Sequence, residues 1–278
     1  MTWTTSNRQA PRGDPNLAAI LTWFVPGAGH LYIGKPLFAL VAFVVVQGLY
    51  WAGLQLSDGM VFEFLQPDLR GPFAGALSPE VGNLGMLVWH TRQYGSGPGF
   101  PRVWPDHIHL GAWLTALSGI LNACLMVRAH VDARLGLGQR RAGTSPSTLV
   151  LLAWLIPGLG HVCQRRRLRG ALVFVLLVGL LVLGTFLAQG SNLDRERHFY
   201  YWAGQFLTGA PAMLLEMAHG YTRVTSDIQY LDAGLGMVCV AGLLNVLAML
   251  DVFAFADASP LATQASKSST QGSAGAAA

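Results

Sequence analysis

The fold of this chain is decided by the stretch WFVPGAGH, residues 23–30, which recurs as WLIPGLGH at residues 154–161. The spacing between the two copies is kept downstream, where aligned glycines such as Gly53 and Gly184 stay in register. Self-similarity at a fixed spacing is the signature of a repeat architecture. The sequence therefore indicates a tandem duplication, and we expect two copies of one structural unit.

A second block of matches lies later in each half at a slightly shorter spacing. It pairs Gly119 with Gly242 and Asn122 with Asn245. The loop that separates the two blocks is therefore shorter in the second half than in the first.

The composition is that of a membrane protein. Charged residues make up 12% of the chain, against roughly 25% in ordinary soluble domains, and the mean hydropathy is +0.42. A helix that crosses the hydrocarbon core of a bilayer needs about 20 apolar residues. The segments that meet this requirement are 36–56, 108–127, 170–188 and 233–255.

The two motif segments, 17–33 and 149–163, are shorter and are broken by Pro-Gly. Proline removes a helical hydrogen bond and glycine permits turn conformations, so the backbone should change direction there. Full crossing by these segments would make the halves inverted, whereas re-entrant segments would make them parallel. The positive-inside rule favours the re-entrant arrangement, which places most Lys and Arg residues and both termini on the cytoplasmic side.

We therefore predict an all-α, multi-pass helical membrane protein with two tandem repeats. Each repeat should contain a broken or re-entrant PGxGH helix and two transmembrane helices. The outer loops should carry short interfacial helices near 81–90 and 211–219. The predicted divisions are a polar, retained N-terminal segment 1–15, a first repeat 16–142, a linker 143–147, a second repeat 148–258 and a disordered Ala/Ser/Gly tail 259–278.

In the first copy, the Pro-Gly-x-Gly-His motif continues as LYIGK, residues 31–35. This signature resembles that of TM2-like proteins, and most closely an uncharacterised bacterial inner-membrane family with the pattern WxxPGxGHxYxG(K/R). The later GLLN element, residues 242–245, and Asp251 fit the same pattern. The resemblance implies a bacterial inner-membrane location and no known activity. The second copy departs from it, because Cys163-Gln164-Arg165 replaces the tyrosine-centred turn.

His30 and His161 follow the breaks directly, and an ionisable side chain at membrane depth is a functional candidate. Alternatively, each neutral imidazole could bond to backbone groups that the proline leaves unpaired, which is the role that we expect. Asn122 and Asn245 should bridge helices and contact one another or the opposite half, or else line a polar path. The residues assigned a motif or functional role are Trp23, Pro26, Gly27, Gly29, His30, Tyr32, Gly34, Lys35, Asn122, Trp154, Pro157, Gly158, Gly160, His161 and Asn245.

A basic run follows the second motif directly. It can act as a topology determinant, or it can bind lipid phosphate through Arg165, Arg166, Arg167 and Arg169. A metal site would need converging ligands, and nothing in the sequence brings Glu216 and His219 together with His107 and His109. No catalytic, cofactor-binding or metal-binding residue is therefore predicted.

The expected function is that of a non-catalytic structural or interaction component of the bacterial cytoplasmic (inner) membrane. The alternatives are a small transporter or channel with a polar site at the repeat interface, and a membrane-embedded enzyme. The expected partners are membrane lipids with anionic headgroups on the cytoplasmic face, and a homo-oligomer or a membrane-protein partner stays open. Nucleic acid is not expected, because the arginines flank apolar spans and form no basic stripe. No cofactor is expected either.

Overall fold

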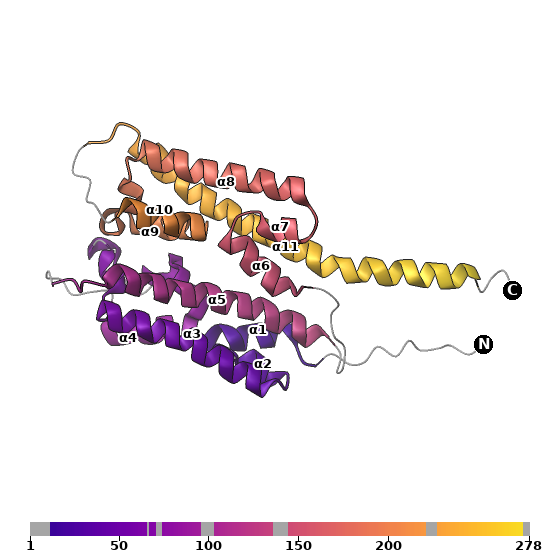
Figure 1. Cartoon of the computed structure of the whole chain (residues 1–278). Coiled ribbons are helices and arrows are strands. Elements are labelled where there is room, and N and C mark those ends of the chain that lie inside the picture. The colour runs from indigo at the N-terminus through magenta and orange to yellow at the C-terminus, as the bar shows by residue number, and fades with distance from the viewer. Residues whose placement is uncertain are drawn as a thin grey trace.

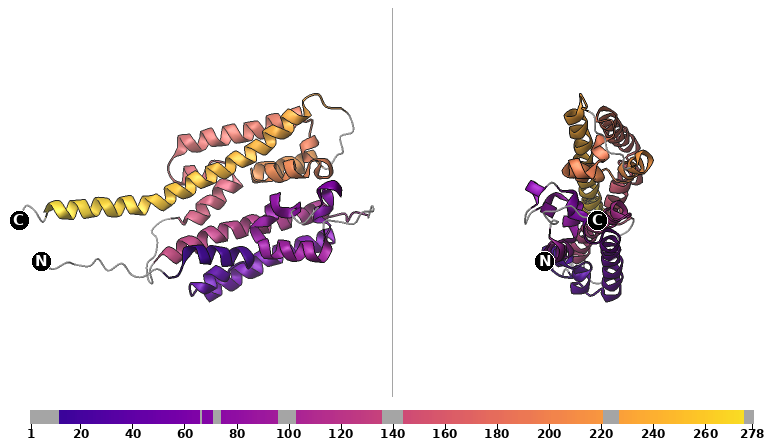
Figure 2. Two further views of the ribbon diagram at one scale, coloured as in Figure 1. Left: turned by 180° about the vertical axis from the view of Figure 1, so that it is seen from behind. Right: turned by 90° about the vertical axis from the view of Figure 1, so that its left-hand side faces the viewer.

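The computed structural model describes residues 12–65, 67–70, 74–95, 103–135, 144–220 and 227–274, with the backbone alone from residue 259 onward. The described part is all-α and consists of two repeats that lie side by side (Figures 1 and 2). The predicted fold class is confirmed.

The first repeat begins with two short helices, and its two long helices follow. Asp14 caps its first helix by accepting a hydrogen bond from the backbone N–H of Leu17 (2.8 Å), with Pro15 at the first helical position. The α-helices are α1 (Pro15–Phe24), α2 (Ala28–Tyr32), α3 (Pro36–Ser57), α4 (Leu84–Tyr94) and α5 (Ile108–Arg134). Four 3-10 helices precede α4: η1 (Val61–Phe64), η2 (Pro67–Leu69), η3 (Ala74–Leu77) and η4 (Pro79–Asn83).

The second repeat follows the same order, with the additional helix α9 in its outer loop. Its helices are α6 (Pro146–Leu155), α7 (Leu159–Cys163), α8 (Arg167–Leu187), η5 (Ser191–Leu193), α9 (Arg195–Phe206), α10 (Ala210–His219) and α11 (Leu231–Ala274). Two boundaries differ from those expected. Ser145 caps α6 by accepting from the backbone N–H of Thr148 (3.2 Å), so the helix starts at Pro146, inside the expected linker 143–147. Gly143 of that linker lies outside the described residues.

Helix α11 also continues to Ala274, into the segment that the sequence predicts to be disordered. Serines, Pro260 and Gly272 make this segment a poor helix former by itself, but a helix already under way adds residues without a new nucleation step.

Four of the helices are long and apolar enough to cross a membrane: Pro36–Ser57, Ile108–Arg134, Arg167–Leu187 and Leu231–Ala258. They correspond to the four predicted spans. Their outward faces carry exposed apolar side chains such as Leu37, Val44, Leu172 and Val175, as expected of helices that face lipid. These helices indicate a multi-pass membrane protein.

Within each repeat the two long helices pack through paired glycines. A Cβ on Gly53 would lie 2.6 Å from the carbonyl oxygen of Gly111, and a Cβ on Gly184 would lie 2.8 Å from that of Gly234. The aligned glycines therefore allow α3 to approach α5, and α8 to approach α11, as small residues do between membrane helices.

The motif helices form hairpins that return to the end where they began. The backbone N–H of Asp14, before α1, donates to the hydroxyl of Tyr32 at the end of α2 (3.2 Å). The backbone N–H of Arg12 donates to the carbonyl of Ala133 at the end of α5 (3.0 Å). Since α1 has 10 residues, it extends about 15 Å, roughly half of a hydrocarbon core. The broken segment therefore does not cross the bundle.

From the other end, the loop after α3 folds back between the helices. Trp23 at the end of α1 donates through its indole N–H to the carbonyl of Val81 in η4 (2.6 Å), and a Cβ on Gly85 would collide with the carbonyl of Phe24. Figure 1 places α4 beyond α1, and α10 beyond α6, toward the end opposite the termini. The helices expected near 81–90 and 211–219 are thus parts of the bundle.

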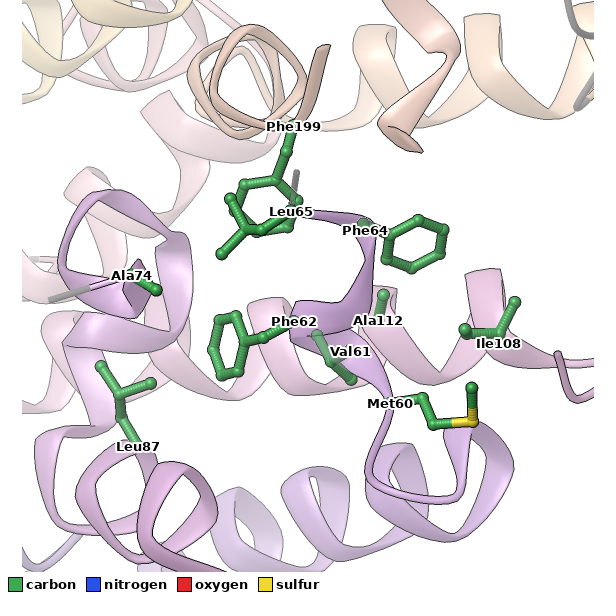
Figure 3. Close-up of a cluster of buried hydrophobic side chains, with 10 residues drawn as sticks. All are labelled: Met60, Val61, Phe62, Phe64, Leu65, Ala74, Leu87, Ile108, Ala112 and Phe199. Atoms are coloured by element: carbon green, nitrogen blue, oxygen red, sulfur yellow. The ribbon is translucent and has the colours of Figure 1, made fainter. Parts of the chain in front are cut away.

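The outer loops also join the two repeats. Phe62, Phe64 and Leu65 of the first repeat lie in one buried cluster with Phe199 of the second (Figure 3). At the opposite end, Arg134 of α5 forms a 2.7 Å ion pair with Asp257 of α11. Contacts at both ends hold the repeats in a parallel arrangement.

Candidate functional site

The two motif turns have nearly the same backbone. Gly27 has φ of 83° and Gly158 has φ of 82°, a left-handed conformation that L side chains rarely adopt. A Cβ on Gly27 would collide with the carbonyl of Ala39, and a Cβ on Gly158 with that of Gly170. Glycine is needed at both turns for its conformation and for the space it leaves.

A threonine holds the turn of the first repeat. The Thr22 hydroxyl accepts from the backbone N–H of Gly29 (3.2 Å) and donates to the carbonyl of Ala18 (2.9 Å). Ala153 stands at the corresponding place in the second repeat and cannot make these bonds. The hydroxyl therefore takes the role that we expected of the histidine in the first turn.

His30 is fully buried, and among the described residues neither of its ring nitrogens has a hydrogen-bond partner. Its ring packs on Phe38, with 4.5 Å between the centroids. Burial lowers the pKa of His30 to about 4, which keeps the imidazole neutral at pH 7. The predicted bonds to the turn backbone are not made.

His161 is also buried, but a 3.0 Å hydrogen bond joins its Nε2 to Asp251 of α11. The same carboxylate pairs with Arg166 (2.7 Å) and Arg169 (3.2 Å). The imidazole therefore belongs to a charged cluster and does not bond to the turn backbone as predicted. The later aspartate of the sequence pattern is the residue that anchors the motif histidine.

The corresponding end of the first repeat has a different set of charges. Lys35 pairs with Asp132 (2.6 Å), and the guanidinium of Arg128 lies over the ring of Phe38, 4.3 Å from its centroid. Arg128 and Asp251 follow the paired asparagines at the same interval, so arginine replaces aspartate beside the first motif turn.

The two asparagines are fully buried and bond within their own repeats. Asn122 donates to the carbonyls of Thr22 (2.8 Å) and Gly82 (2.9 Å), and Asn245 donates to the carbonyl of Leu207 (2.9 Å). The predicted contact between them, or with the opposite half, is therefore wrong. Each one ties the last helix of its repeat to segments whose helical bonding is interrupted.

The arginines of the basic run after the second motif fall into two groups. Arg166 and Arg169 bind Asp251, whereas Arg165 and Arg167 are exposed. Arg165 has φ of 64° and occupies the place of Gly34, whose φ is 78°. The second turn thus has a left-handed residue at the same place as the first, although that residue is not a glycine.

A buried ion pair lies outside the sequence-predicted site. Arg195 binds Glu216 through Nη2 (2.6 Å) and Nε (3.1 Å), and the other carboxylate oxygen accepts from the indoles of Trp113 (2.9 Å) and Trp202 (3.0 Å). With its four donors, Glu216 is fully occupied. A charge in an outer loop gives no sequence signal of such a partner, so Arg195 was missed.

The structure gives no support to a metal site within the described residues. Glu216 pairs with Arg195, and no group of three or more His, Cys, Asp or Glu side chains there could hold an ion. Sequence reasoning also missed Glu80, which is buried in η4 and accepts from the hydroxyl of Thr115 (2.7 Å). Burial raises the pKa of this carboxyl.

Comparison with known proteins agrees with the duplication. A family of unknown function, DUF6677, matches the chain twice, at residues 17–141 and 148–267. No curated protein and no solved structure matches the chain. Since the two matches cover most of the sequence and coincide with the two repeats, the chain belongs to the DUF6677 family, as a tandem pair of its units.

Proposed function

We propose that the protein is a non-catalytic structural or interaction component of the bacterial cytoplasmic membrane, with both termini cytoplasmic and with anionic lipid headgroups at its basic end. One observation carries the proposal: the polar groups of the motifs are enclosed within the fold, whereas arginines remain exposed at the end where the hairpins begin. Asn122, Asn245 and His161 have partners inside the protein, and His30 is sealed against Phe38.

The basic end is shared by the two repeats. Arg12 bonds to Ala133, Arg134 pairs with Asp257, and Arg166 pairs with Asp251, so the basic turns of both repeats lie toward one end. This placement supports the parallel topology, because the positive-inside rule puts such an end in the cytoplasm. Arg165 and Arg167 are exposed at this end, where they can bind headgroup phosphate.

The test measures thermal stability in nanodiscs as the fraction of phosphatidylglycerol is raised against phosphatidylcholine. We expect the double change Arg165→Gln and Arg167→Gln to remove stabilisation by the anionic lipid of about 1 kcal/mol per arginine. The control removes two exposed charges toward the opposite end, Arg92→Gln and Arg197→Gln. Equal lipid dependence in both double variants would contradict headgroup binding at the basic end.

The split helices favour a second candidate, a small transporter. In each repeat two short helices approach from opposite ends, with Gly85 against Phe24 in the first and Gly209 against Trp154 in the second, and broken helices of this kind build binding sites in transporters. The motif histidines and asparagines do not gather at one place, however. Flux of protons or small cations through proteoliposomes above the protein-free rate, lost in Asn122→Leu, would favour this candidate.

A further inference from the structure

A groove of about 260 Å³ runs between α3, α5 and the start of α6, where the two repeats meet on the outside of the bundle. Its walls are apolar. Val41 and Val45 line it from α3, Leu121 and Leu125 from α5, and Leu151 from α6. Because α3 and α5 are candidate membrane spans, the groove opens where lipid chains lie.

Polar side chains line the groove at one end only. They are Arg128 of α5 and the pair Ser147 and Thr148 in the first turn of α6. The Arg128 side chain is 40% exposed and lies 3.7 Å from Asp132, whose closer partner is Lys35 at 2.6 Å. Arg128 can therefore direct guanidinium donors to a ligand while the Lys35–Asp132 pair stays intact.

The depth of the groove matches one leaflet. Arg128 lies close to the end of α5 where Ala133 meets Arg12, which is the basic end of the bundle. From Arg128 to Leu121 the groove follows α5 for about 10 Å, less than half of a hydrocarbon core of about 30 Å. A phosphate at Arg128 would thus stand at headgroup depth, with a chain extending inward from it.

The second repeat provides an internal comparison. At the place of Arg128 it has Asp251, which is taken up by Arg166 and Arg169. The position that Arg128 holds in the first repeat is thus a carboxylate in the second, which offers no hydrogen-bond donor to a lipid phosphate.

We propose that this groove binds one anionic phospholipid, with its phosphate on Arg128 and one acyl chain along Val41, Leu125 and Leu151. Charge complementarity selects the occupant, since the groove joins an arginine at headgroup depth to an apolar trough open to the bilayer. The inference rests on the membrane location in the proposed function and assigns one lipid a site of its own. Because that site does not involve Arg165 or Arg167, either site can fail its test while the other stands.

Native mass spectrometry of the full chain, released from detergent with added palmitoyl-oleoyl phosphatidylglycerol or phosphatidylcholine, tests the proposal. We expect one phosphatidylglycerol per chain to be retained in preference to phosphatidylcholine. Arg128→Gln should weaken phosphatidylglycerol binding about tenfold, the usual loss for one charge-assisted hydrogen bond, whereas Arg128→Lys should keep most of it. Phosphatidylcholine carries the same phosphate but offsets its charge with choline, so Arg128→Gln should weaken its binding less than that of phosphatidylglycerol.

Val41→Trp should fill the trough and reduce binding of both lipids. The matched control is Leu172→Trp, at the corresponding exposed place on α8, which should bind lipid like the unchanged chain. Each variant must elute as a folded protein in size-exclusion chromatography before lipid binding is measured. If Val41→Trp does not fold, Val45→Trp takes its place. Unaltered phosphatidylglycerol retention in Arg128→Gln and the tryptophan variant would overturn the proposal. So would a dimer that Val41→Trp dissociates without loss of lipid, since the occupant would then be a second copy of the chain.

Discussion

His30 and His161 stand at the same place in two copies of one turn, yet their surroundings differ. His30 packs against Phe38 without a hydrogen-bond partner in the described structure, whereas His161 is bonded to Asp251 within a cluster of two arginines. The left-handed glycines before them agree to within a degree. Duplication has therefore kept the backbone of the turn while the side-chain contacts diverged, which indicates that backbone geometry is the requirement that both copies share.

The largest loss of stability should follow substitution of the glycines that the two turns share. Gly27→Ala or Gly158→Ala should destabilise the protein by about 2 to 5 kcal/mol, because the new Cβ suffers both a left-handed backbone and a collision with a carbonyl. Gly34→Ala is the control, since its φ is also positive but open space surrounds it, and it should cost only about 1 to 2 kcal/mol. Unfolding in a mixed-micelle denaturant series measures these differences. Equal losses at Gly27 and Gly34 would show that the collision is unimportant.

The next largest effect should be the loss of stability in acid that His30 causes. The pKa of His30 falls from an ordinary 6.5 to about 4 in the folded chain, so protons bind the unfolded chain more tightly. The contribution of His30 to stability is complete above about pH 6.5 and is lost as the pH falls toward 4. At pH 5 the free energy of unfolding should be about 2 kcal/mol lower than at high pH. In His30→Gln this part of the pH dependence should vanish. Parallel stability curves for the two proteins between pH 7 and pH 5 would contradict it.

Leucine substitutions should affect the two histidines differently. His161→Leu should cost about 1 to 2 kcal/mol, because it removes the hydrogen bond to Asp251. His30→Leu should be close to neutral at pH 7, since it replaces a buried imidazole that has no partner in the described structure with an apolar side chain. Denaturant midpoints at pH 7 give the two values. A larger loss at His30 would show that the packing on Phe38 outweighs the bond in the second repeat.

The smallest effect should be a gain. Arg165 has a left-handed backbone at the place where the first repeat has Gly34. Arg165→Gly should therefore raise the free energy of unfolding by about 1 kcal/mol in neutral detergent, where no anionic headgroup contact is lost. Arg165→Gln keeps a side chain in the strained conformation and controls for the lost charge. A gain of equal size in both variants would assign the effect to charge.

The repeats and the four long helices could be predicted because they depend on local pattern: glycine register, span length and proline breaks. The partner of each histidine could not. Asp251 lies 90 residues from His161, and the corresponding Arg128 has the opposite charge. The same motif therefore does not predict which distant residue contacts each histidine.

The outer loops were misjudged for a related reason. Aromatic residues in such loops are common at the lipid interface, yet Trp202 is buried against Arg195 and donates to Glu216. Interfacial and buried aromatics have the same composition. Only the fold-back of the loop, which is set by tertiary contacts, distinguishes them.

The bonds of Asn122 have a consequence for the order of assembly during synthesis. One side chain on α5 holds the carbonyls of Thr22 and Gly82, which belong to segments that enter the bundle from opposite ends. Both segments leave the ribosome before α5, since chains grow from the N-terminus. Neither segment can bond to Asn122 until the last helix of the repeat has inserted. A nascent chain that stops short of Asn122 can join the two segments through Trp23 and Val81, but it lacks the side chain that bonds both of them to α5.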